Sequence, residues 1–271
     1  MKIQDLGQVD RPILLFGGVY SNLHALNALW DWADQSGILP LDRICTGDIA
    51  AYCADPEACI RFLMEQRTPV VAGNCEIQLA LGSKDCGCGF DEDSMCNILS
   101  GAWYAHAARQ VTPQMQTYLS ELPERIVFRH FDRRYVAIHG GANDVAQFIW
   151  SVTDQDALDH EVATLEAQVG PIDAVIAGHS GIPFERSLKT KTWINAGAIG
   201  MPAHDASAQT HFAVLDRGTL LFHRLSYDVS AAKAAMVAAG LIQGYHEALI
   251  SGIWPSEETL PLELRHSAAS G

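Results

Sequence analysis

Four polar side chains with metal-binding chemistry each follow a short apolar segment of the sequence. They are Asp48, Asn74, His139 and His179, and each stands directly beside a glycine. One carboxylate, one amide oxygen and two imidazoles form a mixed set of oxygen and nitrogen donors that suits Mn, Fe or Zn. Taken singly, each residue has an ordinary explanation as a turn, a cap or a packed histidine. Their repetition after four apolar segments therefore carries the prediction of a metal site.

A second group with chemical potential consists of cysteines. Cys75, Cys86, Cys88 and Cys96 fall within 22 residues, and three of them lie in a Gly- and Asp-rich segment at 82–97. The spacing differs from the paired Cys-x2-Cys arrangement of zinc ribbons. Three interpretations stay open: a further Zn or Fe ion held by some of the thiols, a redox pair that links Cys75 to a cysteine of the segment, or reduced thiols. Because the chain has seven cysteines, complete internal pairing is excluded.

The segments that must position these residues alternate between short apolar strands and amphipathic helices. We predict strands at 12–16, 41–45, 69–72, 125–129, 135–139, 174–177, 193–195, 212–215 and 220–225. We predict helices at 22–32, 55–66, 98–109, 113–121, 154–168, 228–239 and 243–250. This alternation is typical of βαβ units, whose functional residues gather at the carboxyl ends of the strands. We expect one α/β domain over residues 1–271, with mixed sheets and an insertion at about 82–97.

The composition excludes some classes of protein. The 271 residues include 18 Lys and Arg against 32 Asp and Glu, a formal net charge of −14. This balance disfavours a protein that wraps nucleic acid or binds an anionic membrane. A small phosphorylated substrate remains compatible, because a bound cation changes the local field. The sequence has no apolar segment of the ~18 residues that a membrane helix needs and no signal-peptide layout at its start, so we expect a cytoplasmic protein.

Six segments, in order along the chain, resemble the motifs of one enzyme family. They are 16–26 (FGGVYSNLHAL), 47–56 (GDIAAYCADP), 72–76 (AGNCE), 138–141 (IHGG), 177–183 (AGHSGIP) and 195–202 (NAGAIGMP). The sequence is similar in these segments to the calcineurin-like metallophosphoesterases, in their branch of small bacterial phosphodiesterases and diadenosine-tetraphosphatase-like proteins. The resemblance implies a four-layer α/β/β/α sandwich with a two-metal site at the strand ends. It assigns Asp48, Asn74, His139 and His179 to the second metal.

The departures from the family pattern concern the first metal. Gly18, Tyr20 and Gly181 occupy positions where the family has Asp, His and His. The family's leaving-group histidine corresponds to Cys75, which would act beside Asn74. A two-metal site clamps both the attacking and the leaving oxygen of a phosphoryl transfer, and a thiol is a weak proton donor. We therefore expect one divalent ion per active site and reduced, altered or absent activity.

Three further residues are candidates for the same pocket. Tyr20 could bind ferric iron as a phenolate, or its ring could fill the volume of a lost site. His204 and Asp205 could line the pocket, or they could lie in a solvated loop.

Three functions follow from these residues. The first is a metal-dependent phosphoesterase that hydrolyses a small phosphate mono- or diester with a single metal. The second is an inactive binding or regulatory protein that keeps the fold. The third is a thiol-based redox sensor on the same scaffold. The sequence does not indicate the oligomeric state.

Overall fold

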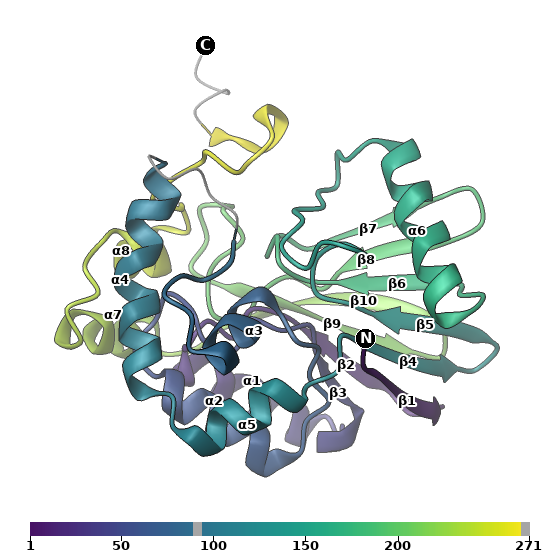
Figure 1. Cartoon of the computed structure of the whole chain (residues 1–271), viewed down its shortest axis with the longest axis horizontal. Helices are drawn as coiled ribbons and strands as arrows, with labels where there is room; N and C mark the ends of the chain where they lie inside the picture. The colour runs from purple at the N-terminus through teal and green to yellow at the C-terminus, as the bar shows by residue number, and fades with distance from the viewer. Residues whose placement is uncertain (89–93, 267–271) are drawn as a thin grey trace.

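Two β-sheets stack face to face at the centre of the protein, and helices cover both outer faces (Figure 1). The structure is a computed structural model that describes residues 1–88 and 94–266. The larger sheet has the strand order β1-β4-β5-β6-β8-β7. Its strands are β1 (Ile3–Gln8), β4 (Arg125–His130), β5 (Arg133–Ala137), β6 (Ala174–Ala177), β7 (Phe184–Ser187) and β8 (Thr192–Asn195). The sheet is mixed, because β5, β6 and β8 run parallel while β4 and β7 pair antiparallel with β5 and β8.

The smaller sheet has the strand order β10-β9-β2-β3. Its strands are β2 (Ile13–Phe16), β3 (Arg43–Cys45), β9 (Thr210–Asp216) and β10 (Thr219–Leu225). The strands β2 and β3 are parallel, whereas β9 pairs antiparallel with both of its neighbours. This sheet is therefore also mixed.

The helices are distributed over the two outer faces. They are α1 (Leu23–Gln35), α2 (Pro56–Gln66), α3 (Asn74–Leu81), α4 (Met95–Gln110), α5 (Pro113–Glu121), α6 (Gln155–Val169), α7 (Val229–Ala238) and α8 (Tyr245–Ser251), with 3-10 turns at Pro40–Asp42 and Leu262–Leu264. Figure 1 shows α6 alone against the larger sheet, with α1, α2 and α5 on the opposite side of the molecule. Of the described helices, none is long and apolar enough to cross a membrane.

The alternation of side chains along a buried strand explains the layers. In β2, Ile13 and Leu15 pack into the core between the sheets, whereas Leu14 and Phe16 pack against the helices on the other face. In β4, Phe128 faces the core between the sheets, and its neighbour Val127 packs beneath α6. Successive residues of a strand point to opposite faces, so a four-residue apolar strand supplies two cores at once. The four-layer sandwich with mixed sheets that the sequence predicts is confirmed.

Several expected elements differ from the structure. The strand predicted at 69–72 is reduced to one bridge between Cys45 and Val70. Helix α3 starts directly afterwards, in a segment for which we predict no helix, and α4 already begins inside the expected insertion. The edge strands β1 and β7 are not predicted from the sequence at all. Their side chains are mostly exposed, so they lack the apolar run on which the prediction of a buried strand depends.

Candidate metal centre

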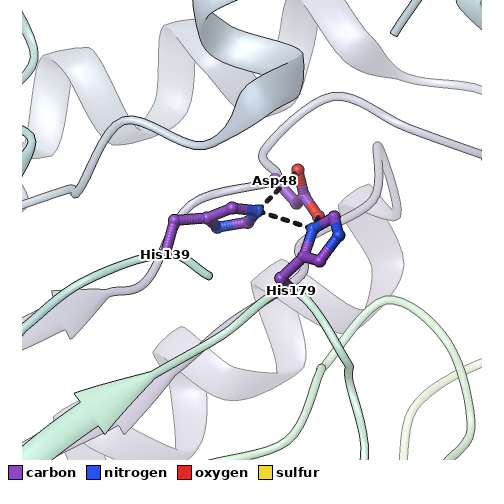
Figure 2. A group of neighbouring side chains, drawn as sticks. All are labelled: Asp48, His139 and His179. Carbon is purple, nitrogen blue, oxygen red and sulfur yellow. Dashed lines mark hydrogen bonds and ion pairs between the residues drawn. The ribbon is translucent and has the colours of Figure 1, made fainter. Parts of the chain in front are cut away.

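Three of the four predicted ligands meet at the edge where the two sheets end (Figure 2). Asp48 follows β3 of the smaller sheet, and His139 and His179 each follow, by two residues, the end of β5 and β6 in the larger sheet. Their ligand atoms lie within 4.8 Å of one another, and all three side chains are buried. Nε2 of His139 is 3.0 Å from Nδ1 of His179 and 3.5 Å from Oδ1 of Asp48.

A backbone carbonyl determines which tautomer of His139 is present. Nδ1 of His139 lies 2.6 Å from the carbonyl oxygen of Thr46, which can only accept a hydrogen bond. Nδ1 therefore carries the proton, and in the neutral ring Nε2 presents a lone pair to the other ligands. Metal-binding histidines commonly have one nitrogen fixed by such a bond while the other faces the ion.

The fourth predicted ligand, Asn74, is oriented by the segment that follows α3. Its Nδ2 donates a hydrogen bond of 2.9 Å to the carbonyl of Cys86 and lies 3.2 Å from Sγ of Cys88. Its Oδ1 is consequently turned toward Nε2 of His139, at 3.0 Å. Asn74 begins α3, so the start of a helix and one backbone carbonyl together aim the amide oxygen into the site.

These contacts create an electrostatic mismatch that a cation would remove. Oδ1 of Asn74 and Nε2 of His139 are acceptor atoms that face each other at 3.0 Å. Nδ1 of His179 lies 3.0 Å from the same Nε2 and adds a further lone pair when the proton of its ring is on the other nitrogen. Oδ1 of Asp48 is buried and accepts no hydrogen bond from any described residue. Burial, together with the neighbouring His139, lowers the pKa of His179 well below its ordinary value, so this ring is neutral at pH 7. A buried set of acceptors without donors fits a bound divalent cation.

Backbone conformation at this edge is unusual. Asp48 and His179 adopt left-handed conformations, with φ of 56° and 59°. Such a φ is uncommon for a residue other than glycine and is concentrated at functional sites. Beside Asp48, Gly47 has a φ of 96°, and a Cβ atom there would come within 2.7 Å of Nδ1 of His139. Glycine at position 47 thus allows the Asp48 loop to approach the histidine closely.

Sequence reasoning missed the residue that holds the Asp48 loop, which is Glu76. This glutamate is fully buried in α3. Its carboxylate accepts hydrogen bonds from the backbone N–H groups of Asp48 and Ile49, at 2.8 and 2.7 Å, and from that of Gly73, at 2.9 Å. Burial and the nearby Asp48 carboxylate raise the pKa of Glu76. The sequence feature that could have indicated this role is the position of Glu76 two residues after Asn74. A glutamate there can accept a hydrogen bond from the backbone N–H at the start of its own helix.

The ring of Tyr20 lies beside Gly18 and Gly181, two of the positions at which the sequence predicts that first-metal ligands are missing. A Cβ atom on Gly18 would lie 2.4 Å from Cζ of this ring, and one on Gly181 would lie 3.2 Å from its hydroxyl. The Tyr20 side chain is buried, and burial and the Asp48 carboxylate raise the pKa of its hydroxyl well above the ordinary value. A neutral phenol is a poor metal ligand, so the geometry favours the space-filling interpretation of Tyr20.

Three of the four clustered cysteines lie beside Asn74. Sγ of Cys86 is 2.7 Å from Sγ of Cys88, and Sγ of Cys75 lies 3.6 Å from Nδ2 of Asn74. All described cysteines are free thiols, and the Asp48 group is the one set of three His, Cys, Asp or Glu ligand atoms within 4.8 Å among the described residues. The hydrogen bond with Cys88 lowers the pKa of the buried Cys75 thiol, but burial and Asp48 raise it further, to well above its ordinary value. The side chain of Cys96 is outside the described residues.

His204 and Asp205, two candidates for the pocket, are held elsewhere. Nε2 of His204 lies 2.7 Å from the carboxylate of Glu257, and its Nδ1 accepts a hydrogen bond of 2.9 Å from the backbone of Trp254. Asp205 pairs with Arg224 at 2.8 Å. His204 therefore anchors the segment that follows α8, and neither residue lines the cavity beside the metal centre.

This cavity opens next to His179 and has a volume of about 60 Å³. It is lined by Tyr20, Tyr52, Phe148, His179, Ser180, Met201, Tyr245, Trp254, Ser256 and Thr259. Cys75 is not among the lining residues.

The sequence pattern of the calcineurin-like phosphoesterase superfamily domain matches residues 18–219. This match covers well over half of the chain, and the protein therefore belongs to that family. The family and the Asp-His-His group together define a phosphoesterase-type protein with a potential metal site.

Individual relatives match this chain over most of its length. An uncharacterized protein of Methanocaldococcus jannaschii is 24% identical over 261 residues, which cover 90% of this chain and 99% of the relative. The crystal structure of a metallophosphoesterase from Sphaerobacter thermophilus matches with a TM-score of 0.69 at 20% identity, over 90% of this chain and 100% of that chain. A hypothetical protein from Pyrococcus horikoshii matches with a TM-score of 0.71 at 15% identity, over 89% and 98%. At these identities the solved structures establish the fold alone.

Proposed function

We propose that this protein is a metal-dependent phosphoesterase with one divalent transition metal, Mn, Fe or Zn, held by Asp48, Asn74, His139 and His179. The observation that carries the proposal is that two buried acceptor atoms, Oδ1 of Asn74 and Nε2 of His139, face each other at 3.0 Å beside the Asp48–His179 pair. Keeping unpaired acceptors in a buried site is unfavourable unless a cation neutralises them. When bound, such an ion supplies Lewis-acid chemistry, which polarises a phosphoryl oxygen of the substrate.

Positioning the ligands and supplying protons are the tasks of the protein's own side chains. Asn74 and His139 are held in position by the carbonyls of Cys86 and Thr46, so little reorganisation accompanies substrate binding. A strong cationic proton donor is absent from the described cavity lining, because burial keeps His179 neutral and the other lining residues are uncharged. The neutral thiol of Cys75 is likewise a weak acid. The site therefore suits esters with a good leaving group, which need little protonation.

Metal content and hydrolysis test this proposal together. Purified protein is loaded with Mn, and bound metal is measured by elemental analysis alongside hydrolysis of an aryl phosphodiester. We expect one ion per chain in the wild type. We also expect that Asp48→Asn and His139→Gln each lose most of this metal and that activity falls at least about 100-fold.

The matched control is Asp205→Asn, which removes a carboxylate outside the cavity. It should retain both metal and activity. Full metal content in the Asp48→Asn and His139→Gln variants would refute the assigned ligands. One bound ion without turnover of any phosphate ester would favour the inactive binding protein.

A further inference from the structure

The cavity beside the metal centre is walled by aromatic rings. Half of its lining residues are Tyr, Phe or Trp, and they come from segments far apart in the sequence. The rings of Tyr52 and Tyr20 are 4.7 Å apart, and those of Tyr52 and Tyr245 are 4.5 Å apart. On the side of the metal centre, the ring of Phe148 lies 4.2 Å from that of His179. A ligand on the metal would therefore extend directly onto an aromatic surface.

One of these rings is held in place by two hydrogen bonds of its own residue. The backbone N–H of Trp254 donates to Nδ1 of His204 at 2.9 Å, and its indole N–H donates to the carbonyl of Pro202 at 2.7 Å. Both donors of Trp254 are thereby occupied, and its half-buried ring also packs against the ring of His204, with the ring centres 5.3 Å apart. A preset ring binds a planar group without first losing conformational freedom.

The charge of the cavity limits the phosphate that fits beside these rings. No lysine or arginine is among the described residues that line it. The segments 89–93 (GFDED) and 267–271 (SAASG), which lie outside the described part, contain none in their sequence either. One divalent ion next to the Asp48 carboxylate leaves a local charge of at most about +1, because the buried carboxylate of Glu76 lies behind the same loop. A phosphate with one negative charge is enough to neutralise this site, whereas one with two or more charges leaves buried charge without a partner.

We propose that the aromatic pocket binds a planar, apolar group of a singly charged phosphodiester, and that the site discriminates against phosphomonoester dianions and polyphosphates. Trp254 and Phe148 are the residues that would determine this specificity. The inference rests on the proposed function only in placing the phosphate at the metal centre.

Equilibrium binding tests the inference without requiring turnover. Three ligands without a hydrolysable ester bond are titrated calorimetrically into the Mn-loaded protein. The first is methyl(phenyl)phosphinate, with one ring and one charge. The second is dimethylphosphinate, with one charge and no ring, and the third is phenylphosphonate, at a pH where it carries two charges. We expect the first to bind at least about 10-fold more tightly than either of the others.

Variants locate the effect. Trp254→Ala should weaken binding of methyl(phenyl)phosphinate about 10-fold and leave that of dimethylphosphinate unchanged. Phe148→Leu leaves the hydrogen bonds of His204 in place, so it serves as a second variant if Trp254→Ala fails to fold. It should also weaken binding of the ringed monoanion. Phe222→Ala removes an exposed ring on β10 outside the cavity and should have no effect.

Each result separates this inference from the proposed function. Equal affinity for the ringed and ringless monoanions, tighter binding of the dianion, or no binding of any of the three ligands would overturn the inference. In the first two cases, hydrolysis of an aryl phosphodiester would still support the proposed function. The expected order of affinities without any hydrolysis would support the pocket and reject the phosphoesterase.

Discussion

Two neighbouring corners of the same sheet edge differ sharply in chemistry. In one corner, oxygen and nitrogen ligand atoms of Asp48, Asn74, His139 and His179 come together. In the other, Gly18 and Gly181 have no donor atoms in their side chains, and the ring of Tyr20 fills the space between them. The corners are in direct contact, since the backbone N–H of Tyr20 donates to the carbonyl of Asp48 at 3.0 Å.

The contrast shows which interactions stabilise each corner. A buried phenyl ring stabilises a fold by packing and has no need of a ligand. Buried carboxylate and imidazole acceptors are unfavourable without a positive charge. Here the ligand residues are nevertheless oriented by hydrogen bonds to surrounding acceptors, which are the carbonyls of Thr46 and Cys86 and the carboxylate of Glu76. We infer that the acceptor corner is maintained for a bound ion, whereas the Tyr20 corner is maintained by packing alone.

The largest expected effect comes from removing the support of the acceptor corner. Glu76→Ala leaves three buried backbone N–H groups without their acceptor, so we expect the free energy of unfolding to fall by about 3–5 kcal/mol and the bound metal to be lost. Urea unfolding and elemental analysis measure the two effects. The stability and metal content of Glu76→Gln should lie between those of Glu76→Ala and the wild type. Glu65→Ala, an exposed glutamate on α2, is the control, and a similar loss there would remove the special role of Glu76.

The packing of the other corner predicts an interaction between two substitutions. Gly18→Asp places a Cβ 2.4 Å from the Tyr20 ring at a φ of 44°, so alone it should cost about 2–3 kcal/mol. In the Tyr20→His background the clash with the ring is relieved, although a contact of 2.7 Å with Cβ of Ala198 remains. The two changes should therefore show a coupling of at least about 1 kcal/mol in urea unfolding. Additive effects would mean that the ring does not exclude a side chain from position 18.

The same corner can be converted toward the family pattern. The variant Gly18→Asp, Tyr20→His, Gly181→His, Cys75→His should bind one more Mn per chain than the wild type. Its activity on an aryl phosphodiester should rise about 10-fold, a barrier lower by about 1.4 kcal/mol. A folded variant that gains neither metal nor activity would show that the corner has been rebuilt around Tyr20.

Acidification should weaken the metal-free acceptor corner through His179. The unfolded chain binds a proton at this residue below about pH 6.5, but burial lowers the pKa in the folded state, which does not bind it. Stability therefore falls as the pH drops below 6.5, by up to about 1.4 kcal/mol per pH unit from this residue. When the free energy of unfolding is measured with urea and plotted against pH, its slope should be shallower for His179→Gln than for the wild type. The exposed His160→Gln should have the wild-type slope.

The smallest expected effect concerns the thiols around Asn74. Cys88→Ser replaces a sulfur that lies 3.2 Å from Nδ2 of Asn74 and leaves the bond to the Cys86 carbonyl in place. We expect a few-fold change in Mn affinity, because one of the contacts that orient the amide is altered. Cys59→Ala, at a buried cysteine on α2, should leave the affinity unchanged. Complete loss of Mn from Cys88→Ser would instead make this thiol part of the metal centre.

The local pattern of the sequence determined the framework of this protein. Apolar runs such as Ile13–Phe16 predicted buried strands correctly, because a strand covered on both faces needs apolar side chains on both. The order of the motifs led to the family and to the four-layer fold. The positions of Asp48, Asn74, His139 and His179 were also visible, since each stands after its own apolar segment beside a glycine. Their role as ligands stays a prediction.

Only the tertiary structure decided how these residues act on one another. Glu76 holds a loop 28 residues away, His139 is oriented by a carbonyl 93 residues away, and His204 anchors a segment 50 residues away. These bonds join side chains to backbone groups, which every residue possesses, so the sequence carries no pattern that marks the partner. The same holds for the exposed edge strand β1, which is paired through its backbone to β4 and not through an apolar face. Local periodicity reports burial, whereas polar contacts across the fold depend on which loops the folded sheets bring together.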